Sequence, residues 1–212
     1  MERSPNGAPP IEFIYFDLGR VLVHFDLDRM LVQIGRVAGI EPRRVAEIIF
    51  HGGLQSRYER GEVGTDEFFE EFCRRAGVRP DRDAMIHAAC DIFWLNAPIV
   101  PMVARLRAAG RRLGILSNTC EIHWNYCLKR FAWLPELFDV RASSFAIGAM
   151  KPEPAIFLAA ARLAGCEPRA IFFTDDIAEH VDGARAVGFN AVRFTSAAAL
   201  ADELRRRGIP LG

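Results

Sequence analysis

The chain has 212 residues, half of them hydrophobic and a quarter charged, and its 27 basic residues balance its 27 acidic residues. This composition excludes a disordered chain and predicts a globular protein with one or two cores. A net charge of zero gives no general attraction for nucleic-acid phosphates or anionic lipids, so we expect no nucleic-acid partner and a small-molecule ligand instead.

The cysteines and the apolar runs indicate the cellular setting. Five cysteines, without any CxxC spacing, argue against a disulfide framework and against a thiolate zinc site. The first ten residues lack the apolar region of a signal peptide, and no later run approaches the roughly 18 apolar residues of a membrane span. We expect a cytoplasmic protein without membrane association, as a monomer or a homodimer.

Short runs of β-branched and aromatic residues predict the strands of a sheet. In chain order they cover residues 11–16, 113–116, 138–140, 171–173 and 191–194. Helical patterns lie before or between the later runs and at the end of the chain, at residues 98–109, 120–131, 154–164, 179–187 and 197–207. Alternating strands and helices predict an α/β fold with a Rossmann-like parallel sheet covered on both faces.

The segment between the first two predicted strands has a different pattern. Residues 26–95 contain four apolar stripes at helical spacing and no strand-like run. We therefore expect a core made of residues 1–25 and 96–212, with an α-helical cap of residues 26–95 inserted after the first strand. Within this cap, Trp94 follows an apolar stripe and is expected to be buried.

Polar residues follow the predicted strands at the points where these end. They are Asp17 after the first strand, Ser117 and Asn118 after the second, and Asp175 and Asp176 after the fourth. Because ligands of open parallel sheets bind at the carboxyl ends of the strands, these side chains are candidates for a common site. Carboxylates suit a hard divalent cation, whereas a hydroxyl and an amide suit phosphoryl oxygens.

Lysine is rare in this chain. Only Lys129 and Lys151 are lysine, and the other 25 basic residues are arginine. Lys151 precedes the helix after the third strand, which would bring it to the same edge as the carboxylates. A compact ammonium, which a forked guanidinium would not replace, is therefore expected at this position.

Four motifs in this order resemble the haloacid dehalogenase-like (HAD) hydrolase superfamily. They are FDLGRVLV at residues 16–23, LSNT at 116–119, MKPE at 150–153 and FTDD at 173–176. The pattern is most similar to the helical-cap branch typified by α-D-glucose-1-phosphate phosphatases with a DLGNV-type first motif. The cap segment QSRYERGE, residues 55–62, also resembles that branch.

The resemblance implies a phosphatase that works through an aspartyl phosphate. Asp17 would attack phosphorus, and Mg²⁺ would be held by Asp17, the Gly19 carbonyl, Asp175 and Asp176. Lys151 would be the second catalytic residue. Ser117 and Asn118 would bind the substrate through its phosphoryl oxygens, and Arg20 and Tyr58 are further candidates for substrate binding. The implied substrate is a small phosphorylated metabolite, with a phosphosugar preferred.

The chain departs from the family pattern at Gly19, where most phosphatases of the superfamily place a second aspartate as general acid and base. A positioned proton donor is worth about 10²–10⁴ in rate, so its absence has to be explained. Either the leaving group is comparatively acidic, such as an anomeric oxygen, or Tyr58, Glu59 or His24 donates the proton.

Two other functions are compatible with the same residues. A haloacid dehalogenase would use Asp17 to attack carbon without a metal, although the pair Asp175 and Asp176 argues against a site that lacks a cation. A binding protein that lost turnover at Gly19 is the non-enzymatic alternative.

Overall fold

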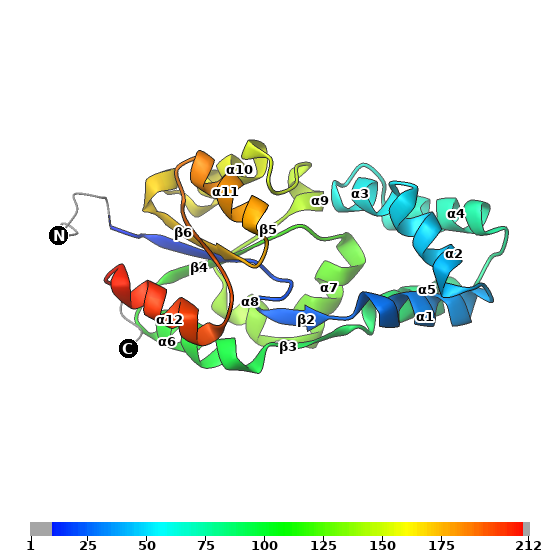
Figure 1. Ribbon diagram of the computed structural model, residues 1–212, viewed down its shortest axis with the longest axis horizontal. Coiled ribbons are helices and arrows are strands. Elements are labelled where there is room, and N and C mark those ends of the chain that lie inside the picture. The colour runs from blue at the N-terminus through cyan, green and yellow to red at the C-terminus, as the bar shows by residue number, and fades with distance from the viewer. Residues whose placement is uncertain (1–9, 210–212) are drawn as a thin grey trace.

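The computed structural model describes residues 10–209, and its centre is a five-stranded parallel sheet. The strand order is β5-β4-β1-β6-β7. The strands are β1 (Phe13–Phe16), β4 (Arg112–Ser117), β5 (Val140–Ser143), β6 (Ile171–Asp175) and β7 (Asn190–Arg193). Figure 1 labels β4, β5 and β6 of this sheet. This architecture confirms the predicted α/β fold with a parallel, Rossmann-like sheet.

Strand β1 lies in the middle of the sheet and sets the position of the residues that follow it. Phe16 pairs with Ile115 on one side and with Thr174 on the other. Because all three strands run in the same direction, Asp17 leaves the sheet beside the ends of β4 and β6. The topology therefore brings three segments that are far apart in the sequence to one edge.

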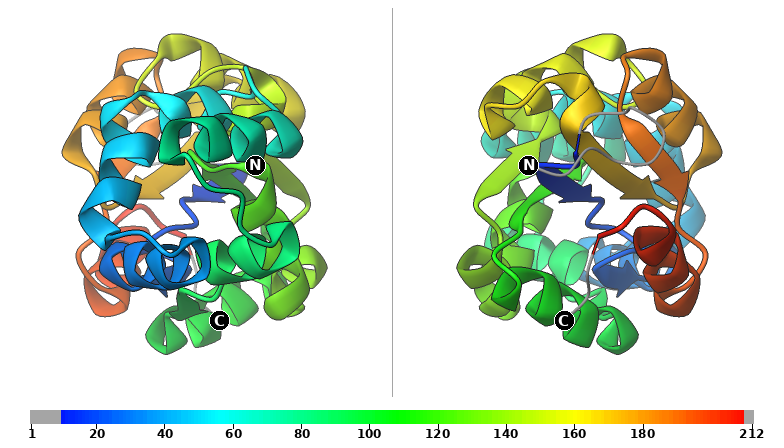
Figure 2. Two further views of the ribbon diagram at one scale, coloured as in Figure 1. Left: turned by 90° about the vertical axis from the view of Figure 1, so that its right-hand side faces the viewer. Right: turned by 90° about the vertical axis from the view of Figure 1, so that its left-hand side faces the viewer.

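Helices cover both faces of the sheet, as the end-on views show (Figure 2). One layer contains α10 (Pro154–Ala164) and α11 (Ala178–Ala186). The other layer contains α6 (Val100–Ala108), α7 (Glu121–Arg130), α8 (Trp133–Leu137) and α12 (Ala197–Arg206). Side chains alternate along β1, so Phe13 and Tyr15 pack into the first layer while Ile14 and Phe16 pack into the second.

The third predicted strand begins later in the sequence than expected. The apolar run 138–140 was expected to be a strand, but β5 covers Val140–Ser143. Phe138 is buried before the strand begins, and its ring packs edge-on against Phe16 at a centroid distance of 5.9 Å. The apolar character of this residue thus serves the packing between sheet and helices.

Five α-helices form a separate body beside the sheet (Figures 1 and 2). They are α1 (Leu27–Ala38), α2 (Pro42–Ala46), α3 (Leu54–Glu59), α4 (Thr65–Ala76) and α5 (Arg82–Cys90), with a π-helical turn at Glu47–His51. Their apolar faces share one hydrophobic cluster that includes Ile34, Leu54 and Phe72. Helix α1 begins where the Asp26 side chain accepts a hydrogen bond from the Arg29 amide, and it ends at Gly39, whose φ is +68°.

Two short strands connect this helical body to the core, and the prediction that residues 26–95 contain no strand was wrong. Strand β2 (Val23–Phe25) pairs antiparallel with β3 (Phe93–Leu95). Three residues are too few to show a strand period in the sequence. Trp94 is 50% exposed, so its expected burial was also wrong: it pairs with His24 on the ribbon, and their rings lie 5.7 Å apart. We keep residues 26–95 as the proposed extent of the cap.

Three short elements complete the core: helix α9 (Ser144–Ile147) and the 3-10 turns Ala97–Ile99 and Pro168–Ala170. Within residues 10–209, no helix combines the length and the apolar character that crossing a bilayer requires.

Candidate active site

Lys151 occupies the centre of the polar cluster at the carboxyl edge of the sheet. None of its side chain is exposed, and its Nζ lies 2.8 Å from Oδ1 of Asp17 and 2.6 Å from Oδ2 of Asp175. The ammonium also donates to the carbonyl of Leu116 at 3.0 Å. Its three donors are therefore all used, and the two flanking carboxylates outweigh the effect of burial and raise the pKa of Lys151.

Asn118 fixes the backbone on which Lys151 stands. Its Oδ1 accepts from the Lys151 amide at 2.8 Å, and its Nδ2 donates to the Lys151 carbonyl at 2.9 Å. This two-way clamp connects the end of β4 to the loop before α10. The Asn118 side chain thus positions the Lys151 loop. Each of its polar atoms makes one hydrogen bond there, which leaves a second amide hydrogen, so its role in substrate binding stays a prediction.

Three carboxylates meet beside Lys151. Burial raises the pKa of Asp17 to about 7; Asp175 and Asp176 act in the same direction, and the Lys151 ammonium opposes them. Burial and the charge of Asp175 raise the pKa of Asp176 as well. Burial would also raise the pKa of Asp175, but Lys151 and His180 outweigh it and lower that pKa. The cluster therefore contains more negative charge than the protein itself neutralises.

This donor set fits a divalent cation. Asp17, Asp175 and Asp176 can each offer one oxygen, and these oxygens lie within 4.8 Å of one another. Ligands on opposite sides of a Mg²⁺ ion are roughly 4 Å apart, so a small side-chain adjustment would bring the three oxygens to one ion. Three carboxylates against one ammonium leave a surplus of two negative charges, which a divalent cation would balance.

The loop after Asp17 holds two of the predicted site residues. Gly19 forms a bridge to Val23, and a Cβ at Gly19 would lie 2.9 Å from the Phe25 ring. Arg20 has a φ of +58°, and its guanidinium lies 5.4 Å from the centre of the Phe25 ring. Arg20 lines a surface depression together with Asp176, outside the cavity described next.

A cavity of about 180 Å³ lies between this edge of the sheet and the helical body. From the core it is lined by Leu18, Gly19, Ser117, Asn118 and Thr119. From the helical body and the connecting ribbon it is lined by Phe25, Leu27, Met30, Phe50, Gln55, Glu59, Ile92 and Phe93, and from α7 by His123. Ser117 is buried and stands at the end of β4, so this cavity is the candidate substrate pocket.

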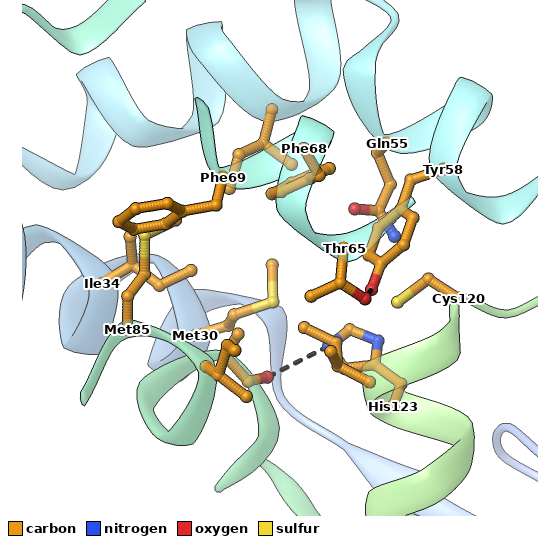
Figure 3. A pocket seen from close by; sticks show the side chains of 14 residues that line it. Met30, Ile34, Gln55, Tyr58, Thr65, Phe68, Phe69, Met85, Cys120 and His123 are labelled. Carbon is orange, nitrogen blue, oxygen red and sulfur yellow. Dashed lines mark hydrogen bonds between the residues drawn. The ribbon is translucent and has the colours of Figure 1, made fainter. Parts of the chain in front are cut away.

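The structure does not bring Tyr58 to that pocket, contrary to its predicted role in substrate binding. Tyr58 is 2% exposed and belongs to the cluster of the helical body. Its hydroxyl lies 2.6 Å from Oγ1 of Thr65, beside a neighbouring apolar cavity of only about 30 Å³ (Figure 3). The polar, glycine-flanked sequence around Tyr58 concealed that helix α3 turns this ring inward.

Four contacts link the helical body to the core near the pocket. Arg60 donates two hydrogen bonds to Glu153, at 2.9 and 2.7 Å, and Thr65 donates to Glu121 at 2.5 Å. The Ser144 hydroxyl donates to the Glu59 carbonyl at 2.5 Å, and His123 Nε2 lies 3.1 Å from the Ala89 carbonyl, as the dashed line in Figure 3 shows. These links close the helical body over the edge of the sheet.

Sequence reasoning missed two residues of the site. His180 lies with Nδ1 at 3.1 Å from both oxygens of Asp175, and Ser144 accepts from the Thr119 amide at 3.0 Å. His180 has a weak signal in the sequence, because it follows Asp175 by five residues at the start of a helix. Ser144 has no such signal, since its contact with Glu59 depends on how the helical body closes.

Comparison with known proteins agrees with this geometry. Residues 53–188, more than half of the chain, match the family of haloacid dehalogenase-like hydrolases. Phosphatase MT3486 of Mycobacterium tuberculosis is 30% identical over 187 residues, covering 85% of this chain and 86% of that protein. The chain belongs to the haloacid dehalogenase-like hydrolase family. The family resemblance that the four motifs indicated is thereby confirmed, and the protein is a hydrolase related to phosphatases.

Other relatives were found by sequence and by structure. Glyceraldehyde 3-phosphate phosphatase of Methanopyrus kandleri is 24% identical over 194 residues, covering 81% of this chain and 82% of that protein. The HAD family enzyme BT-2542 of Bacteroides thetaiotaomicron, solved with magnesium and inorganic phosphate, superposes with a TM-score of 0.79 at 24% identity, covering 87% of this chain and 94% of that one. L-2-haloacid dehalogenase of Xanthobacter autotrophicus has a TM-score of 0.62 at 21% identity, covering 94% of this chain and 84% of that one.

Proposed function

We propose that this HAD hydrolase is a Mg²⁺-dependent phosphatase that cleaves a small phosphorylated metabolite through an aspartyl phosphate on Asp17. The observation that carries the proposal is the contact of Asp17 with Lys151 inside a cluster of three carboxylates. A nucleophilic carboxylate beside a buried ammonium and a set of cation ligands suits attack on a dianionic phosphoryl group. Bound Mg²⁺ would supply positive charge to the phosphoryl oxygens during that attack.

Each residue of the cluster has a part in this reaction. Asp17 attacks phosphorus, and Lys151 holds the carboxylate in place and neutralises charge on the phosphoryl oxygens. Ser117, buried at the end of β4, donates its hydroxyl to one of those oxygens. Asp17, Asp175, Asp176 and the Gly19 carbonyl would hold the metal. The solved HAD family enzyme BT-2542 is in complex with magnesium and inorganic phosphate, which supports a metal ion and a phosphoryl ligand as the partners of such a site.

The pocket favours an uncharged, polar group on the substrate beside its phosphate. Among residues 10–209, no lysine or arginine lines the cavity, so this part of the chain offers no cationic partner to a second phosphate or a carboxylate. Gln55, Glu59, Thr119 and His123 offer polar contacts among otherwise apolar walls. At about 180 Å³ the cavity lies below the range of drug-sized ligand pockets, which suits a small metabolite. A sugar phosphate meets these conditions and remains our preferred substrate class.

The carboxylate cluster supports a phosphatase rather than a dehalogenase. Attack on carbon needs no cation, and the single ammonium of Lys151 would then face three adjoining carboxylates. Release of chloride from 2-haloacids in the presence of a chelator would establish the dehalogenase instead. A cytoplasmic location and a monomeric or homodimeric state stay predictions.

A screen of sugar phosphates, other phosphomonoesters without a second charged group, and bisphosphates, with Mg²⁺ or with EDTA, tests the proposal. We expect hydrolysis that requires Mg²⁺ and prefers sugar phosphates whose sugar carries no charge. It should disappear in Asp17→Asn but persist in Asp202→Asn, a surface control. Wild-type protein incubated with substrate should carry a phosphate on Asp17, detectable by mass spectrometry. Absence of hydrolysis across the screen at saturating Mg²⁺ would favour the non-catalytic binding protein.

A further inference from the structure

The family pattern's second acid is absent at Gly19, and the structure shows what occupies its place. The Phe25 ring lies 2.9 Å from where a Cβ of residue 19 would be. That ring is packed between Phe93, at a centroid distance of 6.0 Å, and the guanidinium of Arg20. A side chain at position 19 would displace this packing, so a proton donor for the leaving group has to come from another part of the chain.

The pocket offers few candidates. Of the side chains that line it, Glu59 and His123 are the ones that titrate. Glu59 comes from the last turn of α3, and His123 comes from the first turn of α7. The choice between them follows from their hydrogen bonds.

Three other candidates, His123, His24 and Tyr58, cannot donate a proton to the leaving group. His123 is neutral because burial lowers its pKa to about 4, and its Nε2 lies within hydrogen-bond distance of the Ala89 carbonyl. A neutral ring that donates through Nε2 has only an acceptor left at Nδ1. Tyr58 is bonded to Thr65 outside the pocket, and His24 lines the surface depression beside Arg20.

Two hydrogen bonds hold Glu59 at the pocket, one to its backbone carbonyl and one to its side chain. Its carbonyl accepts from the Ser144 hydroxyl at 2.5 Å, which ties the end of α3 to the core at the start of α9. Its carboxyl oxygen Oε1 accepts from Gln55 Nε2 at 2.7 Å. Within residues 10–209, Oε2 has no hydrogen-bond partner, so this oxygen is free to carry a proton and donate it. Burial raises the pKa of Glu59, which favours the protonated form.

We propose, on the basis of the phosphatase function above, that Glu59 is the general acid and base of the reaction. As Asp17 forms its bond to phosphorus, the bond from phosphorus to the leaving oxygen breaks, and that oxygen takes the proton of Glu59. In the second step a water attacks the phosphorus of the aspartyl phosphate and gives a proton to the Glu59 carboxylate. The bond between phosphorus and Asp17 breaks, and its electron pair returns to the Asp17 carboxylate.

The test compares two substrates whose leaving groups need a proton to different degrees. An alkyl phosphate expels a basic alkoxide that must be protonated, whereas p-nitrophenyl phosphate expels a stable anion. The ratio kcat/KM reports on the steps up to the departure of the leaving group. In Glu59→Gln we expect kcat/KM to fall by about 10²–10⁴ for the alkyl phosphate and to stay within a few-fold for the nitrophenyl ester. Glu62→Gln makes the same change outside the pocket and should alter neither value.

Each outcome decides the proposal. Equal losses on both substrates would show that Glu59 is only structural, and unchanged values on both would show that it is not used; either result overturns the assignment. If the glutamine variant does not fold, Glu59→Leu removes the half-buried carboxyl altogether and must give the same selective loss. Failure of the wild-type enzyme to hydrolyse any phosphomonoester would overturn the phosphatase function itself, which is a different result.

Discussion

The Nζ of Lys151 lies 2.8 Å from Oδ1 of Asp17, and no part of the lysine side chain is exposed to solvent. The pair joins the end of the central strand to a loop more than a hundred residues away. Burial raises the pKa of Asp17 and Lys151 opposes that rise, so the ammonium favours the ionised carboxylate that nucleophilic attack requires. The same contact therefore supports both the fold and the chemistry.

Removal of Lys151 should destabilise the protein as well as inactivate it. In Lys151→Met, the buried Asp175 and the nearly buried Asp17 lose their cationic partner, and breaking a buried ion pair costs about 3–5 kcal/mol. We expect that loss in the free energy of unfolding, measured with urea, together with loss of phosphatase activity. Lys129→Met removes the other lysine, which is exposed, and should change stability by less than about 0.5 kcal/mol. Similar stabilities for the two variants would contradict this account of the site.

Magnesium should stabilise the folded protein, because the three carboxylates bind it together only when they are assembled. At a Mg²⁺ concentration of about one hundred times Kd, stabilisation is about 2.7 kcal/mol, or roughly 5–11 °C in Tm for a chain of this size. Asp176→Asn should lose most of this shift, whereas Asp202→Asn on the surface should retain it. Thermal unfolding with Mg²⁺ and with EDTA measures the effect. A shift of the same size in all three proteins would place the metal elsewhere.

Gly61 should be essential for closure of the helical body over the core. Its φ is +73°, and an added Cβ would lie 2.2 Å from the backbone oxygen of Phe145. Gly110 has a φ of +74° with nothing within 4 Å, so Gly110→Ala introduces the backbone strain without the clash. We expect Gly61→Ala to lower the free energy of unfolding by about 1–3 kcal/mol more than Gly110→Ala. Equal costs in urea unfolding would show that the contact with Phe145 is adaptable.

His123 should make the protein sensitive to acid. Its pKa is lowered to about 4 in the folded protein, so the unfolded chain takes up the proton first as pH falls. This stabilising contribution is complete above about pH 6.5 and disappears as pH falls toward 4. Allowing for partial exposure of the ring, we expect a loss of about 2 kcal/mol between pH 7 and pH 4.5 that is absent in His123→Gln. His87→Gln, at an exposed histidine, should keep the wild-type pH dependence of urea unfolding; a parallel pH dependence in all three would refute the prediction.

Some parts of this protein could be predicted because local chemistry determines them. Helix α1 was recognised from its apolar stripe, and the parallel sheet was recognised from alternating strands and helices. The polar residues Asp17, Ser117 and Asp175 were expected at strand ends, and the structure brings all three to one edge. Each of these patterns repeats within a few residues, so neighbouring positions in the chain are enough to reveal it.

Other parts depended on contacts that the sequence does not encode locally. The ribbon of β2 and β3 joins segments about seventy residues apart, and each strand alone is too short to show a period. Tyr58 and Glu59 are adjacent in the chain, yet the Tyr58 ring packs into the hydrophobic cluster of the helical body, whereas Glu59 lines the pocket. Which of two neighbouring side chains faces a substrate is decided by the rotation of helix α3 against the core.

The sequence by itself determined the family and the polar residues expected at the ends of the strands. It could do so because these residues belong to motifs that follow apolar runs, and such runs are visible along the chain. Only the tertiary structure decided which residue of the helical body lines the pocket and how Lys151 is held, and our proposal for the acid missing at Gly19 rests on that arrangement. Those questions depend on the closing of one packed body over another. That arrangement is fixed by side-chain packing and by hydrogen bonds between residues such as Glu59 and Ser144, which no pattern along the chain records.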